Sequence, residues 1–256
     1  MIDPRVEVRI AADAPSLAVE AARLLTIAAS AAVAERERFV LALSGGSTPV
    51  PLYRFLASSA ADAALPWERT YVIWGDERCV PAGGPQSNYG SAASAGLLGR
   101  PWSAVHRMLG ELPPEDAAAA YEVELRDLWP GGTEPVPQMD AVLLGLGTDG
   151  HTASLFPRSP AMTEAARWVV STEPHGGLRR LTLTLPVLRA ARLLVFLVAG
   201  RDKAAVAARV LSGDALDLPS ARVVEPLPGS ADHRVVWLLD REAAADLAKG
   251  GSPARP

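Results

Sequence analysis

Short apolar runs recur along the chain, and most are followed by a stretch with the three-to-four-residue apolar spacing of a helix. The runs lie at residues 39–43, 71–74, 141–144, 193–198 and 235–239, and residues 6–10 alternate like an edge strand. We predict helices over residues 14–34 and 114–128, from Ser87, from about Asp202, and after a cap formed by Thr48 and Pro49. Continuous apolar strands that alternate with helices are typical of a parallel sheet covered on both faces.

The same pattern bears on domain organisation. The Gly/Pro-rich segment 130–137 is short enough to be a loop, and the chain shows neither a long linker nor an internal repeat. We therefore expect a single α/β domain over residues 1–248. The polar segment 249–256 predicts a disordered tail.

Composition and charge narrow the classes of function. A net charge of −4 gives no support for nucleic-acid binding, so an anionic ligand would need a local cluster of donors. No apolar run approaches the roughly 20 residues of a membrane span, and the first residues lack the pattern of a signal peptide. The lone Cys79 fits a reducing compartment, so we expect a cytoplasmic protein with no membrane partner.

One Gly-rich turn follows the first buried strand. Ser44, Gly45, Gly46, Ser47 and Thr48 stand between that strand and the next predicted helix. Glycines let the backbone N–H groups approach a ligand, and a helix start adds partial positive charge, so the turn could cradle an anion. A plain strand-to-helix turn is the equally simple alternative. The turn matches neither the phosphate loop of nucleotide-binding proteins nor the dinucleotide motif.

A histidine follows another strand end. Residues 145–152, GLGTDGHT, place His151 directly after a glycine turn and two residues from Asp149. Histidine titrates near neutral pH, which suits a general base. The alternative is a capping histidine on the next helix. His106, His175 and His233 have no comparable setting, and we interpret them as structural.

Further charges lie at other strand ends. Asp76, Glu77 and Arg78 follow the strand at 71–74, and such charges must be solvated, paired or functional. Arg180 precedes an alternating strand, and Lys203 stands at a predicted helix start, where a bound anion would explain a cation. Ligands of parallel sheets bind at the carboxyl ends of the strands, so these clusters predict one shared site. No residue spacing indicates a metal site, and we expect no cofactor.

Taken together, these motifs resemble one family, the bacterial 6-phosphogluconolactonases. The resemblance runs from about residue 5 to 245 and is carried by LALSGGSTP (41–49), WGDERCVP (74–81), Ser87-Asn88, GLGTDGHTASLFP (145–157), RLTLT (180–184), AGRDKA (199–204) and VVWLLDREAA (235–244). It implies a Rossmann-like three-layer α/β/α fold with a mostly parallel sheet, shared with glucosamine-6-phosphate deaminases. The implied substrate is a small sugar-phosphate lactone.

The resemblance also implies roles. His151 would be the catalytic base, Arg78 would lie beside the reacting carbonyl, and the turn at 44–48 would bind phosphate together with Arg180 and Lys203. Apart from the resemblance, we expect Asp149, two residues from His151, to fix the tautomer of its imidazole in the manner of the orienting residue of a catalytic triad. The matching motifs add Asp76, Asn88 and Gly150 to the candidate site.

Two other functions compete with lactone hydrolysis. The deaminases share the Asp-Gly-His sequence but carry a ring-opening glutamate five residues after the histidine, where this chain has Phe156. Phenylalanine cannot relay a proton, which argues against deamination. A sugar-phosphate sensing domain is the second rival. Such regulators usually add a DNA-binding helix-turn-helix, and this chain has no spare segment long enough to hold one.

Overall fold

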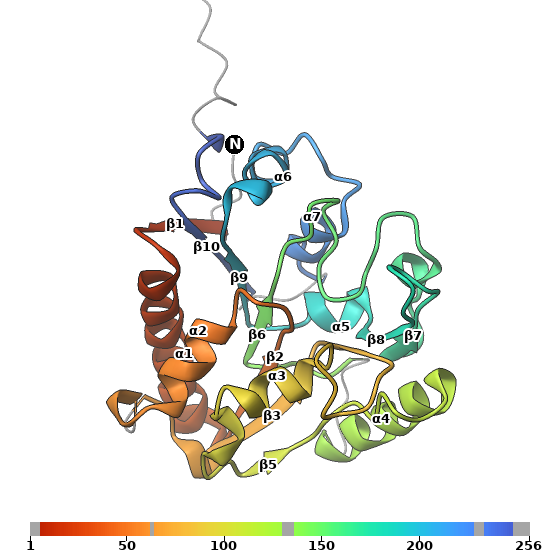
Figure 1. Cartoon of the computed structure of the whole chain (residues 1–256). Helices are drawn as coiled ribbons and strands as arrows, with labels where there is room; N and C mark the ends of the chain where they lie inside the picture. Colours follow the sequence, from red (N-terminus) through yellow and green to blue (C-terminus); the bar gives the residue numbers. More distant parts are fainter. Residues whose placement is uncertain (1–5, 62–63, 130–135, 228–232, 248–256) are drawn as a thin grey trace, which may run out of the picture.

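A computed structural model describes residues 6–61, 64–129, 136–227 and 233–247. Its centre is a seven-stranded, wholly parallel sheet in the order β1-β10-β9-β6-β2-β3-β5 (Figure 1). The strands are β1 (Val6–Ala11), β2 (Phe39–Leu43), β3 (Thr70–Trp74), β5 (Ala104–Val105), β6 (Ala141–Leu144), β9 (Leu193–Val198) and β10 (Arg234–Asp240). The strand β1 is an edge strand, as its alternating sequence predicts.

Seven α-helices accompany the strands in the described residues. They are α1 (Ala14–Arg36), α2 (Val50–Ala57), α3 (Asn88–Ser94), α4 (Pro114–Leu128), α5 (Leu185–Arg189), α6 (Ala204–Leu211) and α7 (Pro219–Val224). Figure 1 shows α1 and α2 on one side of the sheet and α5 and α7 on the other. The three-layer α/β/α arrangement predicted from the sequence is confirmed.

Two hydrophobic cores cover the two faces of the sheet. Side chains alternate between the faces of a strand, so Phe39 and Leu41 of β2 join the core beneath α1 and α2, whereas Val40 and Ala42 join the core beneath α4. Every residue of β2 is buried. Burial on both faces explains why this strand reads as a continuous apolar run.

The apolar sequence of the helix α1 allows two interpretations, a membrane span or a helix of the protein core. By length and composition alone it is apolar enough to cross a membrane, contrary to the expectation that no run approaches that length. In the structure, eight of its residues are buried, Leu17, Leu24 and Leu25 among them, and they pack in the core beside β2. Asp13 caps its first turn by accepting a hydrogen bond from the Ser16 N–H at 2.8 Å. Its apolar character is thus accounted for by packing in the protein core.

A second, smaller sheet was not predicted. It is antiparallel in the order β4-β8-β7 and consists of β4 (Asp76–Arg78), β8 (Arg180–Leu183) and β7 (Val169–Ser171). The strand β3 is therefore followed by a strand and not directly by a helix. Because β4 is three charged residues long, it lacks the apolar signal of a strand.

The observed boundaries of the elements lie close to the predicted ones. The helix α4 and strands β6 and β9 have the predicted bounds, and Ser87 caps α3 by accepting from the Gly90 N–H at 3.0 Å. The predicted cap at Thr48 is wrong: a turn occupies 48–49, and α2 begins at Val50 without a side-chain cap. Residues 130–135 of the predicted loop and the segment 249–256 lie outside the described residues.

Candidate active site

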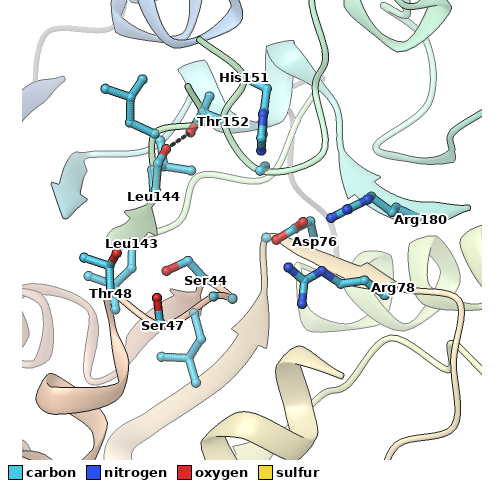
Figure 2. Close-up of a pocket in the computed structure, with 18 of the residues that line it drawn as sticks. Ser44, Ser47, Thr48, Asp76, Arg78, Leu143, Leu144, His151, Thr152 and Arg180 are labelled. Atoms are coloured by element: carbon cyan, nitrogen blue, oxygen red, sulfur yellow. Dashed lines mark hydrogen bonds between the residues drawn. The ribbon is translucent and has the colours of Figure 1, made fainter. Parts of the chain in front are cut away.

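A cavity of about 220 Å³ lies at the carboxyl ends of the central strands. Figure 2 shows walls from the segments after β2, β3 and β6 and from the first residue of β8. The segment after β9 adds Lys203 to the lining. The clusters singled out in the sequence thus meet in one place. The polar and charged residues that line it are Ser44, Ser47, Thr48, Asp76, Arg78, His151, Thr152, Arg180 and Lys203.

Two hydrogen bonds with Tyr53 on α2 fix the turn at residues 44–48. The buried Tyr53 hydroxyl donates to the carbonyl of Ser44 at 2.6 Å and accepts from the Ser44 N–H at 3.1 Å. Gly46 has a φ of 87°, which glycine adopts without strain. Gly45 is required for space, because a Cβ there would overlap the side-chain amide of Asn88. The hydroxyls of Ser47 and Thr48 line the cavity instead of capping α2 (Figure 2).

Two buried carboxylates organise β4. Asp76 accepts hydrogen bonds from the Ser154 hydroxyl at 2.6 Å and from the Asn88 amide at 3.2 Å. Glu77 accepts from the N–H groups of Arg78, Asn88 and Tyr89 and from the Ser87 hydroxyl. Burial raises the pKa of Glu77, although these four donors oppose the rise. Glu77 thereby fixes the start of α3 against β4 and has no capacity left for substrate.

Arg78 and Arg180 face each other across the β4–β8 ladder. Figure 2 shows both side chains beside the carboxylate of Asp76. Burial, and then the charge of Arg78, lowers the pKa of Arg180. Within the described residues, each guanidinium has a buried Nε–H without a protein acceptor. The buried Ser44 Oγ likewise has no hydrogen-bond partner there. Unpartnered buried donors are costly, so this wall is prepared to receive acceptors from a ligand.

His151 projects toward the cavity from the turn after β6 (Figure 2). Its Nδ1 lies 2.6 Å from Asp149 Oδ1, and its backbone N–H also donates to that oxygen at 3.1 Å. Burial opposes ionisation of Asp149, but these two contacts outweigh it and lower the pKa of the carboxyl group. A Cβ at Gly147 would overlap the imidazole, so only glycine leaves room for this position of the ring. An ionised Asp149 is an acceptor for a proton on Nδ1 of this ring.

Lys203 completes the cavity from the end of a 3₁₀ turn, η5 (Arg201–Lys203), directly before α6. Its ammonium pairs with Asp202 at 3.2 Å. Three cations therefore surround a cavity to which Asp76 contributes a carboxylate. Within residues 6–61, 64–129, 136–227 and 233–247, no group of three or more His, Cys, Asp or Glu side chains is arranged to hold a metal ion.

Comparison with known proteins assigns the chain to a family. The family model described as glucosamine-6-phosphate isomerases/6-phosphogluconolactonase matches residues 12–237. The chain belongs to this family. A 6-phosphogluconolactonase of Synechocystis is 41% identical over 221 residues, which are 84% of this chain and 88% of the relative.

Solved structures of the glucosamine-6-phosphate isomerase/6-phosphogluconolactonase family have the same fold. The 6-phosphogluconolactonase of Trypanosoma brucei matches with a TM-score of 0.81 and 31% identity over 96% of this chain and 100% of that one. A monomeric glucosamine-6-phosphate deaminase matches with a TM-score of 0.74 and 20% identity over 93% and 99%. That second likeness concerns the fold alone. The resemblance to 6-phosphogluconolactonases inferred from the motifs is confirmed.

Three of the candidate residues lie outside the wall of the cavity in this family member. Asn88 is fully buried behind Gly45 and Asp76. Gly150 has a φ of 84°, and a Cβ there would press on Leu218. Asp149 stands behind the imidazole of His151. These residues shape the site, whereas the remaining candidates line it.

Sequence reasoning missed Ser154, interpreted His175 as structural, and named Phe156 only as the residue that stands in place of a glutamate. The Ser154 hydroxyl links the segment that carries His151 to Asp76 on β4. Phe156 packs against His151, and His175 stacks on Phe156. Neither a lone serine nor a histidine on a Pro/Gly-rich loop carries a signal in a single sequence. These contacts join the 151–156 segment to β4 and to the turn before β8, which are separate parts of the chain.

Proposed function

We propose that this protein hydrolyses 6-phospho-D-glucono-1,5-lactone to 6-phospho-D-gluconate, as a cytoplasmic enzyme of the pentose phosphate pathway. The observation that carries the proposal is the His151–Asp149 pair at the wall of a cavity lined by three cations. Family membership and the names of the relatives supply the substrate class. The lone Cys79 agrees with a reducing compartment.

His151 acts as the general base in this mechanism. Its Nδ1–H donates to Asp149, so Nε2 has a lone pair with which to take a proton from water. The resulting hydroxide attacks C1 of the lactone, and the carbonyl electrons move to the exocyclic oxygen. Asp149 stabilises the imidazolium that forms, as the orienting carboxylate of a catalytic triad does.

Arg78 stabilises the tetrahedral intermediate. Its buried Nε–H has no acceptor within the described protein and belongs to the cavity wall, where a developing oxyanion would supply one. When the intermediate collapses, the bond from C1 to the ring oxygen breaks. The imidazolium of His151 returns its proton to that departing oxygen, which becomes the free hydroxyl of the open-chain acid.

The phosphate binds at the other cations. The hydroxyls of Ser47 and Thr48, the backbone at Gly45 and Gly46, and the charges of Arg180 and Lys203 also line the cavity. Hydroxyls, backbone N–H groups and cations are the usual partners of a phosphate. Binding at this remote group orients the lactone for attack at C1.

The decisive experiment generates the lactone in the presence of the protein. Glucose 6-phosphate and its dehydrogenase produce the lactone, whose disappearance is followed after subtraction of the spontaneous rate. We expect this protein to accelerate the disappearance. A protein that binds 6-phosphogluconate but leaves the rate unchanged would be a sugar-phosphate sensor instead.

A further inference from the structure

A cluster of three rings lies beside the candidate base. The centroid of the Phe156 ring is 4.7 Å from that of His151 and 3.8 Å from that of His175, with which it is stacked at an interplanar angle of 18°. The two imidazole centroids are 6.1 Å apart. The guanidinium of Arg180 lies over the same Phe156 ring, 5.4 Å from its centroid. One phenyl ring thus touches the proposed base, a proposed phosphate ligand and a third residue.

The orientation of His151 depends on more than its hydrogen bond. The bond from Nδ1 to Asp149 fixes one edge of the imidazole but leaves rotation about that contact free. The Phe156 ring lies tilted at 46° against the imidazole and limits this rotation. Gly147 bounds the imidazole as well, because no Cβ fits there. Together, the hydrogen bond to Asp149, the Phe156 ring and the backbone at Gly147 restrict the orientation of Nε2.

His175 covers Phe156 from solvent. It is exposed on the turn between β7 and β8. Its backbone N–H donates to the Leu178 carbonyl at 2.9 Å, and the Leu178 backbone N–H donates to the His175 carbonyl at 3.3 Å. Phe156 itself is only 6% exposed. The turn leads directly into Arg180, the first residue of β8. The stack therefore anchors this turn to the segment that carries His151.

We propose that Phe156, held in place by His175, is a positioning residue that fixes both the imidazole of His151 and the guanidinium of Arg180 for hydrolysis. The inference rests on the proposed lactonase function and deepens it. A ring with three partners couples the catalytic part of the site to its phosphate-binding part. Loss of the ring then alters kcat through His151 and KM through Arg180.

The test compares substitutions that remove a ring with one that exchanges it. Phe156→Leu removes the ring and keeps an apolar side chain, and His175→Ala removes the stack at an exposed position that tolerates change. His175→Phe keeps an aromatic ring without the imidazole. Phe196→Leu is the matched control, because Phe196 stacks on Trp237 at 3.9 Å in the core and does not line the cavity. For each variant, kcat and KM for the lactone are measured beside the unfolding midpoint.

We expect Phe156→Leu to lower kcat about 3- to 10-fold, the range that corresponds to one aromatic contact. KM should rise in the same variant. His175→Ala should show a smaller change in the same direction, and His175→Phe should restore parental values. Phe196→Leu should lower the unfolding midpoint without altering kcat or KM of the folded enzyme.

Other results would overturn the inference. Parental kcat and KM in both Phe156→Leu and His175→Ala would show that the ring cluster does not position the site. His175→Phe as impaired as His175→Ala would show that the imidazole contacts substrate directly, not through Phe156. These outcomes presuppose a parent that hydrolyses the lactone. A parent without that activity would instead refute the proposed function.

Discussion

The chemistry of single residues in this site depends on what each side chain already binds. Glu77 lies close to the cavity but is saturated by four donors, whereas Arg78 keeps a buried donor that has no acceptor in the part of the chain that the structure describes. Of the two ring nitrogens of His151, only Nδ1 has a hydrogen-bond partner within the described residues. The residues with remaining capacity are therefore the ones available to substrate.

Replacement of His151 by alanine should remove the base. A general base contributes roughly 10²–10⁴-fold, so kcat should fall by about that factor. The proposed phosphate ligands lie on other segments, so 6-phosphogluconate should still bind, as measured by calorimetry. His106→Ala is the control, because His106 pairs with Glu124 and does not line the cavity. A His151→Ala enzyme with more than about a tenth of parental kcat would exclude this residue as the base.

Replacement of Lys203 by alanine should weaken the phosphate contact. The loss of one charged hydrogen bond corresponds to roughly 1.5–3 kcal/mol of substrate binding. Gluconolactone without the phosphate should be a poor substrate whose turnover hardly changes. Arg201→Ala is the matched control, since Arg201 belongs to the same turn but pairs with Asp246. Equal losses for both lactones in Lys203→Ala would contradict a phosphate role.

Single residues also differ in how far the sequence predicts them. Ser44, Arg78, His151, Arg180 and Lys203 were predicted from their positions at strand ends, and the structure brings them together. The places of Asn88 and Gly150 could not be predicted. They follow from the packing of the α3 start on β4 and of the 145–152 turn on Leu218, which are contacts between distant parts of the chain.

Secondary-structure elements also differ in how well the sequence predicts them. Long apolar strands and amphipathic helices carry their own signal, so α4, β6 and β9 could be predicted to the residue. The strand β4 could not, because Asp76, Glu77 and Arg78 are charged and lie in a strand only through pairing with β8. Burial of two carboxylates there requires the hydrogen-bond donors of the 87–89 and 154 segments.

The attachment of the edge strand β1 to β10 should depend on pH. Hydrogen bonds from Arg9 and Arg234 lower the pKa of Glu7 from 4.5 to about 2. A depressed pKa contributes stability above the unfolded value that is lost as the pH falls from about 5 toward 2. The stability difference between the parent and Glu7→Gln, measured by urea unfolding, should therefore shrink over that range. It should also shrink in high salt, because the pair is exposed. A constant difference would show that the ion pair does not stabilise this edge.

The whole molecule shares its fold with a deaminase, and fold alone does not decide the reaction. Two cores on a parallel sheet could be predicted from hydrophobic pattern. Which chemistry the strand ends carry depends on a few side chains, among them Phe156, which packs on the proposed base. The sequence identified that position through family resemblance, but its ring contacts emerge only in three dimensions.

A further prediction concerns glucosamine 6-phosphate and tests whether this protein is a deaminase. The family resemblance implies a ring-opening glutamate in the deaminases at the position of Phe156, and the apolar Phe156 cannot transfer a proton. We expect no ammonia from this substrate under conditions in which the lactone is hydrolysed. Phe156→Glu alone should not install the reaction, since an open-chain amine needs further positioning. Ammonia release at a rate comparable to lactone turnover would reverse the assignment.

Because β1 pairs with β10, this edge of the sheet can form only late in the synthesis of the chain. β1 (Val6–Ala11) is hydrogen-bonded to β10 (Arg234–Asp240) and lies at the edge of the sheet. Its partner strand is therefore the last strand of the described chain to be synthesised, and β1 waits through nearly the whole of translation. Closing so long a loop adds little to the entropy cost, which grows only with the logarithm of length. A nascent chain that stops before residue 234 keeps β1 without its partner strand, and unpaired strand edges are prone to aggregation.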